Sequence, residues 1–563
     1  MFSDPPRRAP FTFSVSVEWL LCLCCLFWVL VVNRPFFKAA LAGRELAEAS
    51  SWGFALALGT GLVAAHALLL APWCNRHTTK PLLALLIVAT AIAGHFTTYL
   101  GAYLDPSMLR NTLRTDVHEA IELFSWAMLP NLLLFGALPL LVLWRAQLRR
   151  QPWPRALGLR LAFIALMALL LVGSLWAIYQ PLASLMRNHK EMRYLITPAN
   201  FIWSGLNVAT TDLRAQAGPR KPIGEDAAPG PGWATQHKPR LLVLVVGETA
   251  RAANWGLNGY ARDTTPQLAR LAARGEVISF PDTTSCGTNT EVSLPCMFAP
   301  VGRRDYDEAR IRGSQSLLHV LARAGVAVSW LDNQSGCKGV CEGLPTSTLI
   351  DAAPAGPCAA GRCLDEGLMS GVERALARAL PDAGTQLLVL HQLGSHGPSY
   401  FRRYPPAFAR FQPSCQHDDL RRCSREEIVN AYDNTLLYTD HVLAQLLAKL
   451  REQSGVDAAL VYVSDHGESL GENNLYLHGI PYAIAPDVQK KVPMLMWLSD
   501  GFAAASGLNL ECLKQRATQP AAHDHLFHTL LALLDVRTGL YEPEWDLGAG
   551  CRQATTVVPA GKP

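Results

Sequence analysis

Three apolar runs in the second half of the chain each carry side chains that can bind a metal ion. The run "LLVLVVGE" ends at Glu248, "QLLVLHQLGSHG" contains His391 and His396, and "ALVYVSDHGES" contains Asp465 and His466. Carboxylates and imidazoles together are typical of a zinc or manganese site of the hydrolase type. Each residue alone also fits a strand-end carboxylate or a packing histidine, so the prediction rests on the set.

The stretch "SCGTNTEVSLPC" (Ser285–Cys296) supplies hydroxyl groups that such a metal could activate. It follows a strand-like segment, "EVISFPD" (Glu276–Asp282), and its two cysteines could close it as a loop. A hydroxyl bound to a metal loses its proton more readily and becomes a competent nucleophile at neutral pH. Thr288 and Thr290 both fit this role, and the spacing does not choose between them.

The elements that would position these residues alternate between strand and helix patterns. The three apolar runs suit buried parallel strands. Between them lie helical patterns such as "SLLHVLARAG" (Ser316–Gly325) and "DHVLAQLLAKLREQ" (Asp440–Gln453). This alternation predicts an α/β domain with a mostly parallel sheet. Ligands of such sheets collect at the carboxyl ends of the strands, which is where the candidate metal ligands fall.

The first third of the chain is apolar enough to cross a membrane. Half of the 563 residues are hydrophobic, and five segments are long enough to span a bilayer, at about 11–32, 52–73, 81–103, 121–144 and 161–180. Nine Lys and Arg lie before the first span and in the loops on that same side, against five in the two opposite loops. The positive-inside rule therefore predicts a cytoplasmic N-terminus and, after five crossings, an external C-terminal domain.

Composition divides the chain into three parts. Residues 1–180 are predicted to form the membrane domain and residues 241–563 the globular domain. Residues 181–240 are predicted to be an amphipathic juxtamembrane segment followed by a linker, because five prolines and four glycines fall among residues 215–240. A net charge of +4, with no basic patch interleaved with aromatic residues, argues against nucleic acid as a partner.

Ten of the fourteen cysteines lie beyond residue 280, in the part predicted to be exported. An even number at short spacing in an oxidising compartment predicts local disulfides. The predicted pairs are Cys286 with Cys296, Cys337 with Cys341, Cys358 with Cys363, and Cys415 with Cys423. Cys512 and Cys551 remain as a candidate fifth bridge. A structural zinc–thiolate site is the alternative, but the gaps match no set of C-x2-C pairs.

Long motifs in this chain resemble those of the phosphoethanolamine–lipid A transferases, inner-membrane enzymes that include the mobile colistin resistance proteins. They are "VVGETARAANWGLNGYARDTTP", "SCGTNTEVSLPCMF", "LHQLGSHGPSY", "NAYDNTLLYTD" and "YVSDHGESLGENNLYLHGIPYAIAPDVQKKVP". The resemblance covers nearly the whole chain. It implies a five-helix membrane domain joined to a catalytic α/β domain of the alkaline phosphatase/sulfatase-like fold.

The resemblance also implies roles for residues around the metal. Glu248, Thr290, Asp465 and His466 match the zinc ligands, and Thr290 matches the nucleophile. Family histidines that bind the substrate phosphate or a second zinc correspond to His396 and His478. Lys338, in "NQSGCKGVC", matches a lysine near the substrate phosphate.

A further set in the membrane domain matches residues at the ethanolamine headgroup. In "NTLRTDVHE", Asn111, Thr115 and Glu119 stand at i, i+4 and i+8, so they would share one face of a helix. From the residues alone, a solvated juxtamembrane helix is the alternative. The resemblance leaves open whether one or two zinc ions act in turnover.

The activity that the resemblance implies is a two-step transfer. Phosphoethanolamine would pass from phosphatidylethanolamine to Thr290 and then to a phosphate of lipid A, in the periplasm, on a monomeric enzyme anchored among membrane lipids. Sister enzymes use core heptose or periplasmic glucan as acceptor. A non-catalytic lipid-binding regulator would be expected to lack the nucleophile or a metal ligand, whereas all four are present here.

Overall fold

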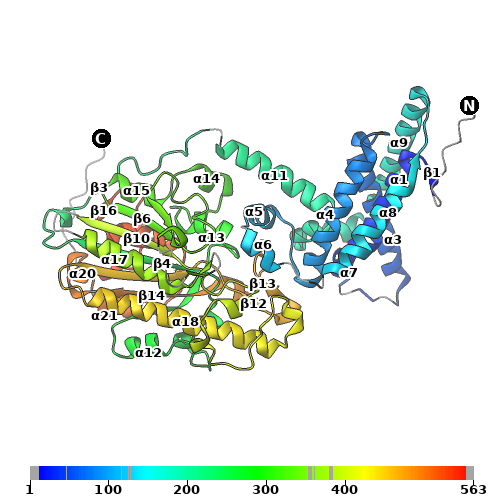
Figure 1. The fold of residues 1–563 in the computed structure, drawn as a ribbon. Helices are drawn as coiled ribbons and strands as arrows, with labels where there is room; N and C mark the ends of the chain where they lie inside the picture. Colours follow the sequence, from blue (N-terminus) through cyan, green and yellow to red (C-terminus); the bar gives the residue numbers. More distant parts are fainter. Residues whose placement is uncertain are drawn as a thin grey trace, which may run out of the picture. The chain divides into compact units, whose positions relative to one another are not determined.

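The computed structural model of this chain describes residues 12–42, 44–45, 47–115, 117–123, 126, 128–216, 218–352, 358–359, 362–379 and 384–552. It divides into two compact units. One groups residues 1–109 with 124–209, and the other groups residues 110–123 with 210–563. Each unit has hydrophobic clusters of its own (Figure 1).

Apolar helices make up most of the first unit. They are α1 (Val17–Phe27), which continues as the π-helix Trp28–Val32, then α2 (Arg34–Ala40), α3 (Ala49–Leu70), α4 (Thr79–Tyr99), α7 (Met128–Leu132), the π-helix Leu133–Ala137, α8 (Leu138–Arg145) and α9 (Trp153–Ala177). Leu21, Trp28 and Leu83 pack in its core. Large apolar side chains such as Leu169 and Trp176 stay exposed on α9, as expected of a helix that faces lipid.

Four stretches in the described residues are long and apolar enough to cross a membrane. They are Ala49–Trp73, Thr79–Tyr99, Met128–Arg145 and Trp153–Ala177. The pair Val17–Val32 and Arg34–Ala40, bent by 60°, makes a fifth if it counts as one span. Each of the five predicted segments overlaps one of these stretches. A short parallel pairing of β1 (Phe13–Val15) with β2 (Ala146–Leu148) joins the first span to the end of α8.

The segments that follow the membrane helices are α10 (Tyr179–Asn188), the 3-10 helix Lys190–Leu195 and α11 (Ala199–Gln216). Part of the Pro/Gly-rich stretch beyond them packs on the second unit. There β3 (Ala228–Pro229) pairs with β16 (Val536–Arg537). The backbone N–H groups of Gly230 and Gly232 donate to Asp535, and the indole of Trp233 donates to the carbonyl of Leu534.

An eight-stranded sheet forms the centre of the second unit, in the order β15-β5-β14-β11-β4-β10-β6-β7. The strands are β4 (Arg240–Gly247), β5 (Ile278–Thr284), β6 (Ala327–Asp332), β7 (Thr346–Thr348), β10 (Thr385–His391), β11 (Asp457–Ser464), β14 (Lys491–Leu498) and β15 (Ala521–Ala522). Neighbours from β11 to β7 pair in parallel, and β14 runs antiparallel to both β11 and β5. The three apolar runs of the sequence are β4, β10 and β11, so the predicted mostly parallel sheet is confirmed.

Alternate residues of β4 enter two separate cores on the two faces of this sheet. Leu242, Leu244 and Val246 pack in one core, with α13 (Thr290–Met297), α15 (Leu317–Arg323), α20 (Asp500–Ala505), α21 (Leu510–Arg516) and α22 (Asp524–Leu533). Leu241, Val243 and Val245 pack in the other, with α12 (Pro266–Ala273), α17 (Met369–Arg378) and α18 (Arg425–Arg451). Helices therefore cover both faces (Figure 1), and the strand ends are free to carry a site.

Shorter elements complete the second unit. They are α5 (Pro106–Arg114, which begins before the unit's first residue), α6 (Val117–Leu123), α14 (Glu308–Gly313), α16 (Leu349–Ala352), α19 (Asp487–Lys490), and the two-residue strands of the pairs β8–β9 (Cys358–Ala359 with Arg362–Cys363) and β12–β13 (Ser469–Leu470 with Tyr476–Leu477).

Candidate metal centre and nucleophile

The candidate site lies where three adjacent parallel strands end. Register pairs Ser464 of β11 with Gly247 of β4, and Val246 of β4 with His391 of β10. Glu248 follows β4 directly, and Asp465 follows β11 directly. The strand ends thus bring together side chains that are more than two hundred positions apart in the sequence.

Glu248, Asp465 and His466 form a buried group that can hold a metal ion. One ligand atom from each lies within 4.8 Å of the others, and all three side chains are fully buried. The Oδ1 atom of Asp465 accepts from the backbone N–H groups of Thr249 and His466. Its Oδ2 atom has no hydrogen-bond partner among the described residues. Because an unpaired buried carboxylate oxygen is costly, this atom fits a metal ligand.

The charges in this group also fit a bound cation. Burial raises the pKa of Asp465, and the charge of Glu248 raises it further, to about 6. Burial alone would lower the pKa of His466, but Asp465 and Glu248 outweigh it and raise the pKa to about 10. Two adjacent buried carboxylates therefore favour a positive charge beside them, which either a protonated His466 or a divalent metal would supply.

Thr290 lies against this group at the first position of α13. Its Oγ1 atom is 3.1 Å from Oε2 of Glu248 and 3.4 Å from Nε2 of His466. The side chain of Asn289 caps the helix by accepting from the N–H of Val292. Helix N-termini favour negative charge, which would suit an ionised hydroxyl or a phosphate at this position.

Thr288, the other candidate, has a different hydrogen-bond partner. Its hydroxyl donates to the backbone carbonyl of Ile480 at 2.7 Å. Among the described contacts, none joins it to the metal group. The structure therefore brings Thr290, and not Thr288, into the cluster.

Two further histidines gather beside His466. The ring centroids of His466 and His478 are 4.3 Å apart, and those of His396 and His478 are 5.5 Å apart. The Nδ1 atom of His478 lies 2.7 Å from a carboxylate oxygen of Glu468, whose other oxygen accepts from the hydroxyl of Tyr400. Glu468 thus fixes the orientation of the His478 ring. The ring contacts place His396 and His478 beside His466, and their role in binding the substrate phosphate or a second zinc stays a prediction.

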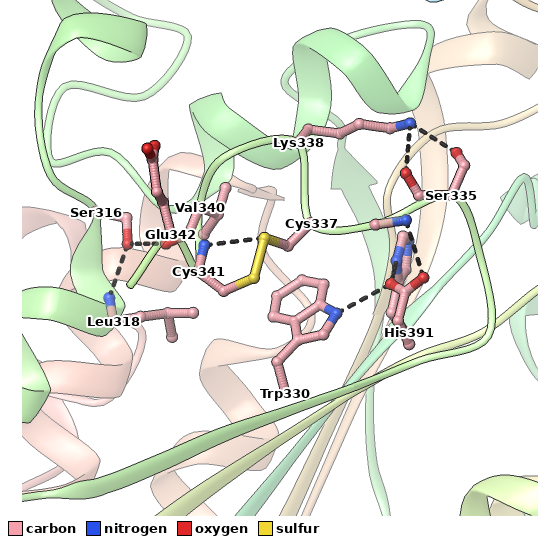
Figure 2. The surroundings of a disulfide bond; sticks show 12 residues. Ser316, Leu318, Trp330, Ser335, Cys337, Lys338, Val340, Cys341, Glu342 and His391 are labelled. Carbon is pink, nitrogen blue, oxygen red and sulfur yellow. Dashed lines mark hydrogen bonds and ion pairs between the residues drawn. A yellow bond between two sulfur atoms is a disulfide. The ribbon is translucent and has the colours of Figure 1, made fainter. Parts of the chain in front are cut away.

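Lys338 lies on a loop closed by the disulfide Cys337–Cys341 (Figure 2). Its ammonium group donates to the carbonyl and the hydroxyl of Ser335 at 3.1 and 2.6 Å. Within the described part of the chain, no hydrogen bond or ion pair joins Lys338 to the metal group. Its predicted contact with a substrate phosphate stays a prediction.

Asp332, at the end of β6, is a site residue that the sequence reading missed. Its Oδ1 atom lies 2.8 Å from Nδ1 of His391 and accepts from the indole of Trp330. The Nε2 atom of His391 is buried, lies 4.0 Å from a carboxylate oxygen of Glu248, and has no hydrogen-bond partner among the described residues. The signal was the same as for Glu248, an apolar run ending in an acid, but "AVSWLD" is short and interrupted by Ser329.

Comparison with known proteins decides the family. The sulfatase family model matches residues 240–536, and the model of phosphoethanolamine transferase EptA/EptB matches residues 62–213. Phosphoethanolamine transferase EptA of Escherichia coli K12 is 37% identical over 552 residues, which cover 96% of this chain and 97% of that protein. This chain belongs to the phosphoethanolamine transferase family. The resemblance drawn from the motifs is therefore confirmed.

Two more relatives of this transferase support the assignment over nearly its full length. Phosphatidylethanolamine transferase Mcr-1 of Escherichia coli is 35% identical over 542 residues, covering 93% of this chain and 96% of that protein. The solved structure of lipooligosaccharide phosphoethanolamine transferase A from Neisseria meningitidis matches with a TM-score of 0.89 and 36% identity, covering 96% of this chain and all of that chain. The predicted fold, a membrane domain plus a sulfatase-like α/β domain, is confirmed.

The predicted headgroup residues of this transferase do not lie on one uninterrupted helix. Helix α5 ends at Arg114, and α6 begins at Val117. The hydroxyl of Thr115 donates to the carbonyl of Asn111 at 2.8 Å. A Thr hydroxyl commonly bonds the carbonyl four residues before it, and here the bond keeps Thr115 beside Asn111 at the end of α5. The expected shared face is therefore corrected to a helix end followed by a second helix. The side chain of Glu119 lies outside the described residues.

A glycine fits the loop after β10 tightly against the metal group. Gly394 has a φ of +55°, and a Cβ atom there would lie 2.5 Å from the carbonyl oxygen of Glu248. The next residue, Ser395, donates its N–H to the same carbonyl. Only glycine allows this close approach at that backbone conformation.

Five disulfides form in the globular part of the transferase. They are Cys286–Cys296, Cys337–Cys341, Cys358–Cys363, Cys415–Cys423 and Cys512–Cys551. The four predicted pairs are all present, and the two remaining cysteines make the fifth bridge. The first bridge joins the strand end before Thr290 to α13.

Proposed function

We propose that this enzyme transfers phosphoethanolamine from phosphatidylethanolamine to a phosphate of lipid A, with Thr290 as nucleophile and zinc as cofactor. The observation that supports it most is the Thr290 hydroxyl, held within 3.4 Å of both Glu248 and His466 in a buried group. The names of two relatives point to the acceptor: a lipooligosaccharide phosphoethanolamine transferase and a Kdo(2)-lipid A phosphoethanolamine 7''-transferase.

Glu248, Asp465, His466 and Thr290 would hold the zinc ion. Two carboxylates, one imidazole and one hydroxyl are a donor set that zinc accepts, and His466 offers Nε2 because Nδ1 faces the carbonyl of Gly467. Bound zinc would lower the pKa of the Thr290 hydroxyl and offset negative charge on the phosphoryl group. One zinc fits this donor set. His396 and His478 would bind the substrate phosphate or a second zinc.

The reaction would proceed in two displacements at phosphorus. In the first, Oγ1 of Thr290 forms a bond to phosphorus as the phosphorus–oxygen bond to diacylglycerol breaks, and the leaving oxygen takes up a proton. In the second, a phosphate oxygen of the acceptor bonds to phosphorus as the bond to Thr290 breaks. The second step replaces the phosphoester to Thr290 with a phosphoanhydride to the acceptor, and the Thr290 oxygen takes up a proton. One phosphorus–oxygen bond breaks for each one that forms, so no oxidant or nucleotide is required.

The chain's own residues would position this chemistry and move its protons. Glu248 accepts the hydrogen bond of the Thr290 hydroxyl, so it orients Oγ1 before attack. Glu468 holds Nδ1 of His478, which leaves Nε2 for a hydrogen bond or proton transfer with the leaving oxygen. Lys338 would offset charge on the phosphate, and Asn111, Thr115 and Glu119 would contact the ethanolamine group.

The location that suits these substrates is the inner membrane of a Gram-negative bacterium. The N-terminus would be cytoplasmic, and the catalytic domain of a monomer would face donor and acceptor lipids from the periplasm. Each transfer adds an amine beside a phosphate, so it would weaken the attraction of cationic peptides such as polymyxin to the outer membrane.

Mass spectrometry of lipid A from cells expressing the enzyme tests this proposal. A gain of one phosphoethanolamine unit that Thr290→Ala abolishes is the expected result. Unchanged lipid A beside modified core heptose or glucan would move the acceptor to a sister activity. If no modified product of any kind is found, a non-catalytic lipid-binding protein becomes the better interpretation.

A further inference from the structure

The segment 110–123 belongs to the catalytic unit although it lies between two membrane-type helices in the sequence. It groups with residues 210–563, whereas Leu109 and the helices from α7 to α9 belong to the other unit. It carries Asn111, Thr115 and Glu119, the residues proposed above for the ethanolamine group. Several ion pairs join this segment to the rest of the catalytic unit, and two of them lead toward the proposed site.

The first ion pair reaches the residue beside the nucleophile. Arg114, the last residue of α5, places Nη1 2.6 Å from Oε1 of Glu291, which directly follows Thr290 on α13. The Glu291 side chain is fully buried, and that of Arg114 is 37% exposed. Arg312 of α14 contacts the same Oε1 atom at 3.0 Å and also donates to the Glu291 carbonyl. Two guanidinium groups therefore fix the first turn of the nucleophile helix from both its side chain and its backbone.

A wider set of charges keeps Arg114 and Arg312 in place. Arg110 bonds to Asp212 at 3.1 Å and to Glu308. Asp212 also contacts Arg114 at 3.0 Å, and Glu308 contacts Arg312 at 3.0 Å. Such a network is more rigid than a single pair because each side chain is held at more than one atom.

The second ion pair reaches the histidine loop. Glu122, near the end of α6, contacts Arg403 at 2.5 Å, with only 2% and 4% of the two side chains exposed. The Nε atom of Arg403 donates to the backbone carbonyl of His396 at 2.9 Å. The far end of the segment is thus linked, through one guanidinium group, to a histidine proposed to bind the substrate phosphate.

From these contacts we infer that Arg114 and Glu122 are positioning residues that hold the donor-headgroup segment in register with Thr290 and His396. The inference rests on the proposed function. The ethanolamine and the phosphorus of one donor molecule must be held at a fixed separation, and the two pairs connect the residues proposed for each. Burying charge is costly, and an apolar contact would hold the segment at less cost. One pair directed at the nucleophile helix and one at the histidine loop therefore favour a role in alignment.

Single-turnover kinetics on the full-length enzyme in detergent, with zinc and phosphatidylethanolamine, separates alignment from stability. The amplitude of adduct formation on Thr290 reports the fraction of folded, active enzyme. The rate reports how well donor and nucleophile are aligned within that fraction. Arg262→Gln is the matched control, because Arg262 is 34% exposed and pairs with a fully buried carboxylate, that of Asp433, by a single 3.1 Å contact.

Arg114→Gln is expected to slow adduct formation about tenfold at saturating donor, with an amplitude equal to that of Arg262→Gln. Arg114→Lys should recover part of the rate, and Glu122→Gln should slow the reaction to a similar extent. The inference is overturned if Arg114→Gln reacts at the rate of Arg262→Gln, or if only amplitudes change. If the wild-type enzyme itself forms no adduct on Thr290, the proposed function fails, and this inference fails with it.

Discussion

The metal group and the segment 110–123 are positioned in different ways. Glu248 and Asp465 stand directly after strands of one sheet, so backbone pairing over many residues fixes their separation. The segment 110–123 is joined to the same unit by side chains, chiefly Arg114 to Glu291 and Glu122 to Arg403. A sheet holds the groups that would do the chemistry, and ion pairs hold the part that would receive the substrate. The first arrangement is hard to shift, while the second can be changed by single substitutions.

Among changes to the site that the sheet positions, Thr290→Ala should cause the largest loss of transfer activity. Removing the hydroxyl that contacts both Glu248 and His466 should lower the rate of transfer by about 10⁴-fold or more, because the covalent route is lost. Thr288→Ala is the matched control and should cost about tenfold or less, since its hydroxyl bonds to the Ile480 carbonyl instead. The measurement is transfer to lipid A in vitro. Equal losses in the two variants would contradict the assignment.

Asp465→Asn should be nearly as damaging and should act through the metal. It removes the charge of a metal-group carboxylate whose buried Oδ2 atom has no hydrogen-bond partner among the described residues, so bound zinc and activity should both fall, activity by about 10³-fold. Elemental analysis of the purified protein gives the metal content. Asp305→Asn, on a side chain 76% exposed, is the control and should keep its metal. If the variant Asp465→Asn retains stoichiometric zinc, Asp465 is not required as a metal ligand, and this part of the account is wrong.

Asp332→Asn should have an intermediate effect. Asn keeps the shape of Asp332 but weakens the hold on Nδ1 of His391, whose Nε2 atom lies beside Glu248. Loss of such a supporting carboxylate typically costs about 10- to 100-fold in metal affinity or activity. Zinc titration and transfer rates measured together would test it. The control is Asp263→Asn, on an exposed side chain. If the two variants have the same zinc affinity and transfer rate, His391 does not need its contact with Asp332.

Cys286→Ser with Cys296→Ser should give the smallest effect on rate. Opening this ten-residue loop should lower the free energy of unfolding by about 2–3 kcal/mol and slow adduct formation by only about threefold, since α13 stays packed in the core. The matched control is Cys415→Ser with Cys423→Ser, which opens a loop of eight residues. It should lose similar stability, measured by urea unfolding, with no change in rate. A large loss of rate in the first variant would mean that the bridge itself aligns Thr290.

The sequence was most informative where local rules act. An apolar run followed by an acid located Glu248 and Asp465, because a buried strand exposes its end to solvent and ligands. The same rule applied to "AVSWLD" would have found Asp332. Asn289 before Thr290 is a helix N-cap signal that could have favoured Thr290 over Thr288.

Long-range side-chain contacts could not be predicted from the local sequence pattern. Arg114 and Glu291 are separated by 177 positions, and nothing local marks either as the partner of the other. The break between α5 and α6 was missed because Asn111, Thr115 and Glu119 have the spacing of one continuous helix. Such contacts depend on the tertiary fold, which periodicity does not encode.

The most direct test of the account is the site of the covalent adduct. The full-length enzyme would be incubated with phosphatidylethanolamine in the absence of acceptor, then digested, and the peptide containing Thr288 and Thr290 sequenced by mass spectrometry. The account predicts phosphoethanolamine on Thr290, present in Thr288→Ala and absent in Thr290→Ala. Phosphoethanolamine on Thr288, or turnover to lipid A without any adduct on this peptide, would contradict it.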